Sequence, residues 1–495
     1  MKNLLTATQM HDADAYTIKQ QEISSVDLME HAAKAFVKFF KKKFPDKEKQ
    51  ISILCGNGNN GGDGLAIARL LHNEEYENIS VFLINFGTRQ SKDYTENLAR
   101  LAKTKLKPIV ITAAEQFENK DVDLIIDAIL GSGLNKPFTG KYVELASKLN
   151  ALHKTILSVD VPTGFPGEGL IDRNYKGIKA DLVICFQRPK INFFFPESIA
   201  AFDRFVVVDI GLDEDYLENA KADWKLIVKP SIRQRKNFTH KGTYGHALIV
   251  AGNTSTMGAA LLAARACLYA GSGLTTLCLP SGGLIALNST LPEVMALPRT
   301  EYLAIEVFEK FTSIAIGPGF GIEEENEALF SKLIELKKPM VIDADALNML
   351  AKRKDLLDKL PWQTILTPHV KEFDLLFGEH QSWWDRVETA RKHAKQRKLI
   401  IVLKNQYTFV CLPTGEVCIN QTGNPSMASG GMGDVLTGIM VGLLAQSYSA
   451  TDAATLAVYV HGKAGDELAE KRFTVGASQV AKRIAKIMKK LVAEF

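Results

Sequence analysis

Short apolar runs alternate with amphipathic stretches through the first part of the chain. Two helical patterns, near residues 7–20 and 25–43, come first. The apolar runs that follow lie at residues 51–55, 79–85, 109–112, 124–128, 155–160, 182–186 and 205–209. Because these runs are short, rich in Val and Ile and separated by helical patterns, they are typical of buried parallel strands. We therefore predict a doubly wound α/β domain over residues 1–215.

A second α/β pattern begins after a polar stretch. The chain is polar from Gly211 to about Phe238, and we expect residues 216–238 to form a linker. Further apolar runs lie at residues 246–251, 274–279, 313–317, 339–343, 363–367 and 399–403, with helical patterns at 257–270, 434–446 and 451–470. A length of 495 residues exceeds what one core usually supports. We therefore predict a second α/β domain over residues 239–495.

The composition, with 46% hydrophobic and 23% charged residues, fits a soluble globular protein. A formal net charge of +4 is small for this length and argues against a nucleic-acid or membrane surface. The sequence contains neither a signal-peptide core nor the ~20 uncharged apolar residues that a membrane helix needs. Six cysteines without a CxxC pair, mostly in apolar runs, indicate reduced thiols. We expect a cytoplasmic protein.

A glycine-rich turn follows the first apolar run. Residues 56–64 contain five glycines and three asparagines, and a helical segment follows at 65–71. Such a turn offers backbone N–H groups and a positive helix end to an anion, and its asparagine oxygens suit a hard cation. Asp127 and Asp160 end two other predicted strands, so all three segments should meet at one sheet edge. Asp160, held in a turn with Pro162, is a candidate acid–base group.

These three segments resemble, in order and spacing, the epimerase domain of the NAD(P)H-hydrate repair enzymes, which has a Rossmann-like fold. The resemblance implies that the ligands are NADH and NADPH hydrated on the nicotinamide ring (NADHX and NADPHX), whose R and S forms are interconverted. It implies that Asp160 contacts the reacting ring and that Asn60, Asp127 and Thr163 bind K⁺. The residues implied to hold the hydrate are Asn59, Asn60, Gly61, Gly62, Asp63, Gly131, Ser132, Gly133, Leu134, Asn135, Lys136, Pro137 and Asp160. Thr163 replaces the serine of many relatives, and residues 185–196 match the family poorly.

A second glycine-rich turn, Ser-Gly-Gly-Met-Gly-Asp at residues 429–434, precedes a helical pattern in the second half. Backbone N–H groups at a helix start can stabilise a phosphoryl group during its transfer. Asp434 at this point can take the proton from an attacking hydroxyl group. The turn resembles that of the ribokinase-like superfamily, whose members phosphorylate hydroxyl groups of small molecules.

Further segments at residues 317–321, 343–348 and 367–372 narrow this resemblance to the ADP-dependent NAD(P)H-hydrate dehydratase. The implied reaction converts the S hydrate and ADP into NAD(P)H, AMP and phosphate, with Mg²⁺. The residues implied to contact the hydrate are Ala259, Ala260, Gly319, His369 and Asp434. Those implied to contact the nucleotide are Lys404, Asn405, Gln406, Tyr407, Thr408, Gly430, Gly431 and Gly433. The loop at 404–408 departs from the usual Lys-Gly-Ala-x-Thr of the family.

The sequence thus predicts a fusion of an epimerase with a ribokinase-like dehydratase, with small molecules as partners and a homo-oligomeric assembly. One alternative is a vitamin or hydroxymethylpyrimidine kinase fused to a nucleotide-binding module. Another is that the first domain is a non-catalytic scaffold. The acidic string at 343–348 disfavours the kinase, and the presence of Asn60 and Asp160 disfavours the scaffold.

Overall fold

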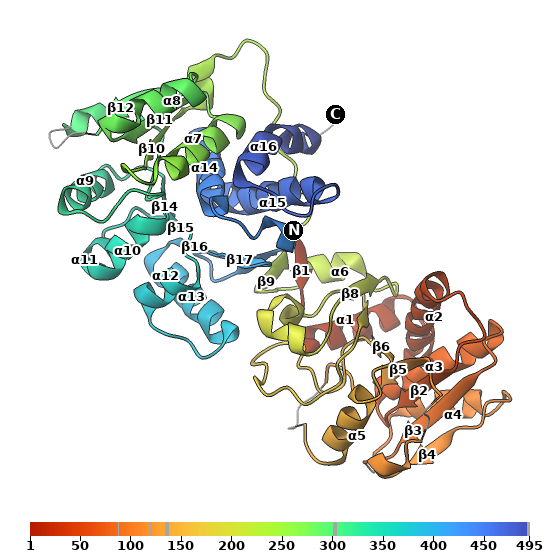
Figure 1. Ribbon diagram of the computed structural model, residues 1–495. Helices are drawn as coiled ribbons and strands as arrows, with labels where there is room; N and C mark the ends of the chain where they lie inside the picture. Colours follow the sequence, from red (N-terminus) through yellow and green to blue (C-terminus); the bar gives the residue numbers. More distant parts are fainter. Residues whose placement is uncertain (88, 119–120, 134–137, 300–303, 493–495) are drawn as a thin grey trace. The chain divides into compact units, whose positions relative to one another are not determined.

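The computed structural model describes residues 1–87, 89–118, 121–133, 138–299 and 304–492, and its contacts divide the chain into two compact units (Figure 1). The N-terminal unit is Asn3–Ala222 with Ser382–Trp384. The C-terminal unit is Met1–Lys2, Asp223–Gln381 and Asp385–Phe495. The segment expected as a linker contains the end of helix α6 (Glu214–Asn219) and strand β9 (Trp224–Leu226).

The N-terminal unit contains a parallel sheet. Its seven described strands follow the order β4-β3-β2-β5-β6-β7-β8. They are β2 (Ile51–Cys55), β3 (Ile79–Ile84), β4 (Ile109–Ile111), β5 (Leu124–Ala128), β6 (Thr155–Val159), β7 (Leu182–Phe186) and β8 (Phe205–Val208). All neighbouring strands pair in parallel, which confirms the predicted doubly wound fold. The strand order reverses between β2 and β5, where such sheets bind ligands beyond their carboxyl ends.

The helices of this unit are α1 (Ala7–Gln20), α2 (Ser25–Lys43), α3 (Asn59–Asn73), α4 (Lys92–Leu101), α5 (Lys141–Asn150) and α6. Thr6 and Ser24 cap α1 and α2 with their hydroxyl groups, so both helices begin where their hydrophobic periodicity begins. Helix α3 begins at Asn59, six residues earlier than the predicted segment at 65–71. The asparagines and glycines of the turn therefore form the first turns of the helix.

Close packing explains why the start of α3 is rich in glycine. A Cβ atom on Gly56 would lie 1.9 Å from the Ile129 carbonyl oxygen, and one on Gly61 would lie 1.7 Å from the Gly56 carbonyl oxygen. Glycine thus lets the helix approach the ends of β2 and β5. Left-handed backbone is not the reason for these glycines, because those of residues 56–64 are absent from the described residues with positive φ.

The C-terminal unit is built around a larger mixed sheet of eleven described strands in the order β1-β9-β18-β17-β16-β15-β14-β13-β10-β11-β12. The strands not yet given are β1 (Lys2–Leu4), β10 (His246–Val250), β11 (Leu274–Leu279), β12 (Met295–Pro298), β13 (Ser313–Ile316), β14 (Met340–Ile342), β15 (Ile365–Leu366), β16 (Ile400–Leu403), β17 (Thr408–Cys411) and β18 (Val417–Asn420). The sequence predicted β10, β11, β13, β14, β15 and β16. It missed β1, β9, β12 and the antiparallel strands β17 and β18.

The helices of this unit are α7 (Met257–Tyr269), α8 (Leu284–Thr290), α9 (Glu324–Glu335), α10 (Ala344–Lys352), α11 (Lys354–Leu357), α12 (Val370–Phe377), α13 (Trp383–Arg397), α14 (Met432–Ala445), α15 (Ala450–Ala469) and α16 (Ala477–Leu491). Among the described residues no helix is long and apolar enough to cross a membrane. All six cysteines are free and buried.

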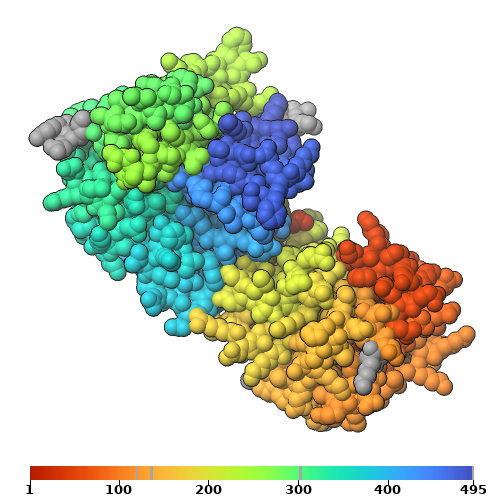
Figure 2. All heavy atoms as spheres, in the orientation of Figure 1, coloured from red at the N-terminus to blue at the C-terminus, as the bar shows by residue number. Residues whose placement is uncertain are grey.

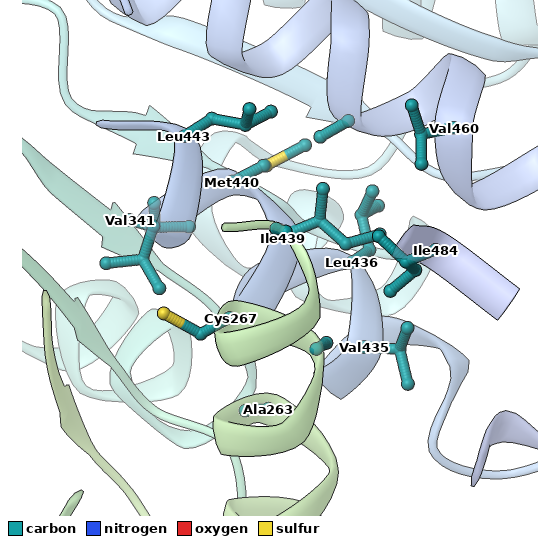
Figure 3. Packing of buried hydrophobic residues seen from close by; sticks show 14 of the residues in the cluster. Ala263, Cys267, Val341, Val435, Leu436, Ile439, Met440, Leu443, Val460 and Ile484 are labelled. Atoms are coloured by element: carbon teal, nitrogen blue, oxygen red, sulfur yellow. The ribbon is translucent and has the colours of Figure 1, made fainter. Parts of the chain in front are cut away.

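Helix α14 is buried along almost its whole length and lies against α7 (Figure 3). A Cβ atom on Gly438 would lie 2.1 Å from the Ala263 carbonyl oxygen, so glycine sets this close approach. Val435, Ile439 and Met440 fill the space around the contact. Helix α16 also packs against α7, and Figure 2 shows its dark blue atoms beside the green ones of α7 at the surface. This packing fixes the position of the N-terminus of α14.

The close approach of α3 predicts a local loss of stability on Gly61→Ala. The added methyl group must displace the Gly56 backbone, so we expect the N-terminal unit to lose about 1–3 kcal/mol or more of its free energy of unfolding. Hydrogen exchange of the full chain should show faster exchange in β2 and α3. Gly58→Ala is the control, because nothing lies within 4 Å of a Cβ atom there. Equal exchange in the two variants would contradict the packing argument.

Candidate active sites

A cavity of about 920 Å³ lies at the carboxyl edge of the N-terminal sheet. Its lining includes, among the residues predicted from the sequence, Asn59, Asn60, Asp63, Gly131, Ser132, Gly133 and Asp160. Gly61 and Gly62 are buried within α3 behind this lining. Leu134, Asn135, Lys136 and Pro137 lie outside the described residues. The structure therefore brings the described residues of three separate segments to one cavity.

The N-terminus of α3 presents backbone N–H donors at the cavity. Gly62 N–H already donates to the Gly58 carbonyl, at 3.1 Å. The N–H groups of Asn59, Asn60 and Gly61 precede it in the helix, and such groups have no partner within their own helix. Gly58 caps the helix without a side-chain hydrogen bond, so no side chain competes with a ligand there. This arrangement suits a phosphate group.

Asp160 directly follows β6 and is held from several sides. Lys190 Nζ lies 2.7 Å from its Oδ1 atom, to which Phe186 N–H also donates at 3.1 Å. Burial lowers the pKa of Lys190, but the Asp160 carboxylate together with Cys185 and Asp14 raises it by more, so the Lys190 pKa is raised overall. The φ of Asp160 is +65°, a left-handed conformation that is costly for a residue other than glycine. The surrounding structure therefore fixes this carboxylate at the cavity wall.

Asp127, at the end of β5, is fully buried and has neutral hydrogen-bond partners. Its Oδ2 accepts from Ser158 Oγ and Thr163 N–H at 2.8 Å each, and its Oδ1 accepts from Thr163 Oγ1 at 2.6 Å. Burial raises the Asp127 pKa, while the Thr163 hydroxyl acts in the opposite direction. The nearby helix start carries Asn60, whose Nδ2 atom is buried without a hydrogen-bond partner. Carboxylate, amide and hydroxyl oxygens of this kind are suitable ligands for a hard cation.

The lining of this cavity also includes Lys190, His11 and Asp14, to which the sequence analysis assigned no role. Lys190 comes four residues after β7, and His11 and Asp14 lie on α1. Burial raises the pKa of Asp14 to about 6, against the effect of the Lys190 charge. Lys190 stands at a strand end like Asp160, and this position was the signal that could have identified it. The spacing of His11 and Asp14 on one helical face was a weaker signal.

The second site lies at the carboxyl edge of the C-terminal sheet. The predicted residues, and the residues that contact them, follow five neighbouring strands: β10, β13, β14, β15 and β16. Asp343 follows β14, His369 follows β15 and Lys404 follows β16. Gly319 belongs to the loop after β13, and its carbonyl accepts from Thr256 Oγ1 at 2.7 Å. The parallel order of the strands therefore explains why residues so distant in sequence converge.

A buried ion pair supports the start of α14. Lys404 Nζ lies 2.8 Å from Asp343 Oδ1, and Thr437 Oγ1 donates to Asp343 Oδ2 at 2.8 Å. Burial opposes ionisation of Asp343, but the Lys404 charge and the hydrogen bonds from Lys404, Thr437 and Thr367 together lower the pKa of Asp343. A Cβ atom on Gly433 would lie 3.3 Å from Lys404 Nζ. The ammonium group thus sits beside the backbone of the glycine turn.

Asp434 lies in the first turn of α14 and is partly buried. Burial raises its pKa to about 7, the Asp343 charge adds to this rise, and Lys404 opposes it. The pKa values of the two neighbouring carboxyl groups therefore differ. Asp343 stays ionised, whereas Asp434 can exchange a proton near neutral pH. Glu372, on α12, is the next acid of the cluster, and burial raises its pKa. Its partner is His369, whose Nε2 lies 3.3 Å from Glu372 Oε1.

A cavity of about 400 Å³ opens beside this cluster. Five of the predicted nucleotide residues line it: Lys404, Asn405, Gln406, Thr408 and Gly433. Strands β17 and β18 supply part of the wall through Thr408 and Asn420, which places the predicted loop at the start of a hairpin. His461 of α15 also lines the cavity, and its Nε2 atom is buried without a hydrogen-bond partner. The sequence analysis did not identify His461, because its helix has the pattern of apolar residues that is typical of a buried helix.

The remaining predicted residues have different surroundings. Ala260 is fully buried in the core beside α14, whereas Ala259 is partly exposed. Gly430 is exposed, and Gly431 adopts a φ of +88° at the helix cap. Tyr407 and Gly431 are not among the residues that line the 400 Å³ cavity. The described residues contain no cluster of three or more His, Cys, Asp or Glu side chains that could hold a metal ion by itself.

Comparisons with known proteins agree with this geometry. Residues 247–490 match a family described as NAD(P)H-hydrate dehydratase, and residues 25–192 match the YjeF-related protein N-terminus. The bifunctional NAD(P)H-hydrate repair enzyme Nnr of Moorella thermoacetica is 33% identical over 95% of this chain and 93% of its own length. The corresponding protein of Coxiella burnetii is 32% identical over 91% of each chain.

A solved structure gives the same result for the fold of the second half. A ribokinase-like superfamily protein from Enterococcus faecalis superposes with a TM-score of 0.50 at 26% identity, over 55% of this chain and 97% of its own. The C-terminal unit therefore has the predicted ribokinase-like fold. Taken with the two family matches and the full-length relatives, the chain belongs to the family of bifunctional NAD(P)H-hydrate repair enzymes.

Proposed function

We propose that the chain repairs hydrated NADH and NADPH in two steps. The N-terminal site interconverts the R and S hydrates, and the C-terminal site dehydrates the S form at the expense of ADP, giving NAD(P)H, AMP and phosphate. The observation that carries this proposal is the pairing, in each unit, of a helix start that lacks a side-chain cap with a carboxylate at the carboxyl edge of the sheet. Asp160 lines the N-terminal cavity, and Asp434 lies in the first turn of α14.

In the N-terminal site, the free N–H groups of Asn59, Asn60 and Gly61 bind phosphate groups of the hydrate. Ser132 and Gly133 line the same cavity. Asp160 exchanges a proton at the hydroxyl group of ring carbon 6, and Lys190 fixes its orientation.

The N-terminal site also fits K⁺. Asn60, Asp127 and Thr163 would hold it, because their side chains offer an amide oxygen, a buried carboxylate and a hydroxyl oxygen. When bound, K⁺ would supply positive charge that offsets the phosphates of the hydrate.

In the C-terminal site, phosphorylation converts the ring hydroxyl into a better leaving group. Asp434 takes the hydroxyl proton while the β-phosphoryl group of ADP is transferred to the oxygen. The N–H groups of the glycine turn and the Lys404 ammonium stabilise the charge on that group. The ring nitrogen lone pair then expels phosphate, and loss of a proton from the adjacent ring carbon forms the C=C bond of NAD(P)H and restores the lone pair. Mg²⁺ would enter with the nucleotide, held by its phosphates and by carboxylates such as Asp343.

The nucleotide occupies the 400 Å³ cavity beside residues 404–408. We also propose that the enzyme acts in the cytoplasm, where its small-molecule substrates are used, and that it forms a homo-oligomer. Nucleic acids and membranes have no role in the proposed reactions.

Two variants separate the proposed activities. With racemic hydrate, K⁺, Mg²⁺ and ADP, the wild type should restore all of the NADH. Asp160→Asn should convert only the S half at the normal rate, because epimerisation falls roughly 10²-fold or more. Asp434→Asn should form no NADH yet still interconvert R and S, as measured by chromatography of the two forms. Loss of both activities in either folded variant would contradict the two-site assignment, and a wild type inactive with ADP or ATP would contradict the function itself.

The dehydration step should depend on the ionisation of Asp434. A general base acts when deprotonated, and burial raises the pKa of this carboxyl to about 7, so kcat/KM should rise with pH through about 7 and then level off. Asp345→Asn removes a neighbouring charge that raises the Asp434 pKa, and should move the midpoint slightly lower. A rate independent of pH between about 5 and about 9 would argue against Asp434 as the base.

The proposed cation site predicts a K⁺-dependent epimerisation. Thr163→Val removes one oxygen ligand and the hydrogen bond to Asp127, so the K⁺ concentration for half-maximal rate should rise about tenfold. Thr163→Ser keeps the oxygen and should behave like the wild type. Titration of R-to-S conversion with KCl at constant ionic strength provides the measurement. The site is elsewhere if Thr163→Val leaves the K⁺ dependence unchanged.

A further inference from the structure

One face of helix α1 forms part of the wall of the N-terminal cavity. Ala7, Met10, His11 and Asp14 all line it, at the spacing of successive helical turns. Asp14 is the carboxylate on this face, and Asp160 and Lys190 line the same cavity. The mechanism above assigns a role to Asp160 and Lys190 and leaves Asp14 without one.

The two carboxylates are held differently. Asp160 Oδ1 contacts Lys190 Nζ at 2.7 Å and accepts from Phe186 N–H, so an ion pair and a backbone donor orient this carboxyl group. Among the hydrogen bonds and ion pairs of the described residues, Asp14 has none through its carboxyl group. An acid group on a cavity wall without a protein partner is available to a ligand.

Charges around Asp14 come from several elements. His11 lies on the same helix, Lys190 and Asp160 lie beyond β7 and β6, and Asp63 lies on α3. Burial is the main cause that raises the pKa of Asp14 to about 6; Asp160 adds to the rise, and Lys190 and His11 oppose it. Asp14 can therefore carry or release a proton close to neutral pH.

Inversion at ring carbon 6 needs proton transfer on both faces of the ring. On one face an acid protonates the hydroxyl group, the C–O bond breaks, and the ring nitrogen lone pair forms a C=N bond as water leaves. On the other face water adds to carbon 6, the C=N electrons return to nitrogen, and a base accepts the proton. One proton is donated and one is accepted, so the two groups exchange roles in the reverse direction and nothing is consumed.

We propose that Asp14 is the second acid–base group of the N-terminal site and acts on the ring face opposite to Asp160. This proposal rests on the proposed epimerase function. Asp160 and Asp14 reach the same cavity from different elements, a strand end and a helix. A substrate ring bound between them can meet one carboxyl group on each face.

The test compares Asp14→Asn with Asp12→Asn in the full chain. Asp12 lies on the same helix but is exposed, so it is the matched control. Starting from separated R or S hydrate, Asp14→Asn should lower kcat for interconversion about 10²-fold, whereas Asp12→Asn should leave it unchanged. Asp14→Glu keeps an acid group and should recover part of the rate. The wild-type pH profile should contain a limb near the pKa of Asp14 that Asp14→Asn removes.

ADP-dependent dehydration of the S hydrate by the same preparations reports whether the chain is intact, because it uses the other site. If the wild type itself fails to interconvert R and S, the proposed function is wrong. If the wild type is active and Asp14→Asn keeps its kcat and pH profile, the role of Asp14 is overturned. A rise in KM with unchanged kcat would assign Asp14 to binding and would also overturn the proposal. Equal loss in Asp14→Asn and Asp14→Glu, with the pH limb retained, would mean a structural role.

Discussion

Each unit buries carboxylates at the carboxyl ends of parallel strands. Burial of a charge costs free energy, and the groups that surround these carboxylates offset this cost. An isolated buried charge costs several kcal/mol, so its neighbours must compensate for it. Lys404 compensates Asp343 strongly enough to lower the Asp343 pKa despite complete burial. Among the described residues Asp434 forms no such ion pair, and burial is the main cause that raises its pKa. The site thus contains one permanent charge and one group that titrates.

The N-terminal unit also pairs one carboxylate with a lysine and leaves another without a cation. Lys190 pairs with Asp160, and Asp14 has no such partner among the described residues. Asp127 follows a third pattern, because its buried carboxylate has hydroxyl and backbone amide partners instead of a lysine. The three patterns provide a carboxyl group held in one orientation, a carboxyl group open to a ligand and a place for a cation. The helix starts at α3 and α14 add the backbone donors that phosphate groups require.

Much of this organisation could be read from the sequence. The bounds of α1, α2, β2, β5 and β7 were predicted as observed, because caps and short Val- and Ile-rich runs mark them clearly. The start of α3 was placed too late, since asparagine and glycine have low helix propensity and only packing against β2 and β5 makes them helical. Strands β1 and β9 contain polar residues within their three positions, so neither forms the apolar run that marks the equally short β4 and β14.

The glycine-rich turns and the acidic residues at strand ends predicted both sites, because such features are local in the sequence. Their partners carry weaker signals in the sequence. Lys190 follows a strand, but its distance to Asp160 shows its role, and the face of α1 that meets the cavity shows that of Asp14. His461 stands in a helix whose pattern indicates core packing, and only the unpaired Nε2 distinguishes it. Contacts between elements far apart in sequence leave no local pattern.

The six buried cysteines can report on local unfolding of the two units. Burial raises the pKa of every one of these thiols, so in the closed state each is protonated and shielded from alkylating reagents. Cys55 and Cys185 belong to the N-terminal unit, and Cys267, Cys278, Cys411 and Cys418 belong to the C-terminal unit. Because a thiol reacts only when its surroundings open, the labelling rates of these two groups record the stability of each unit separately, with no probe introduced.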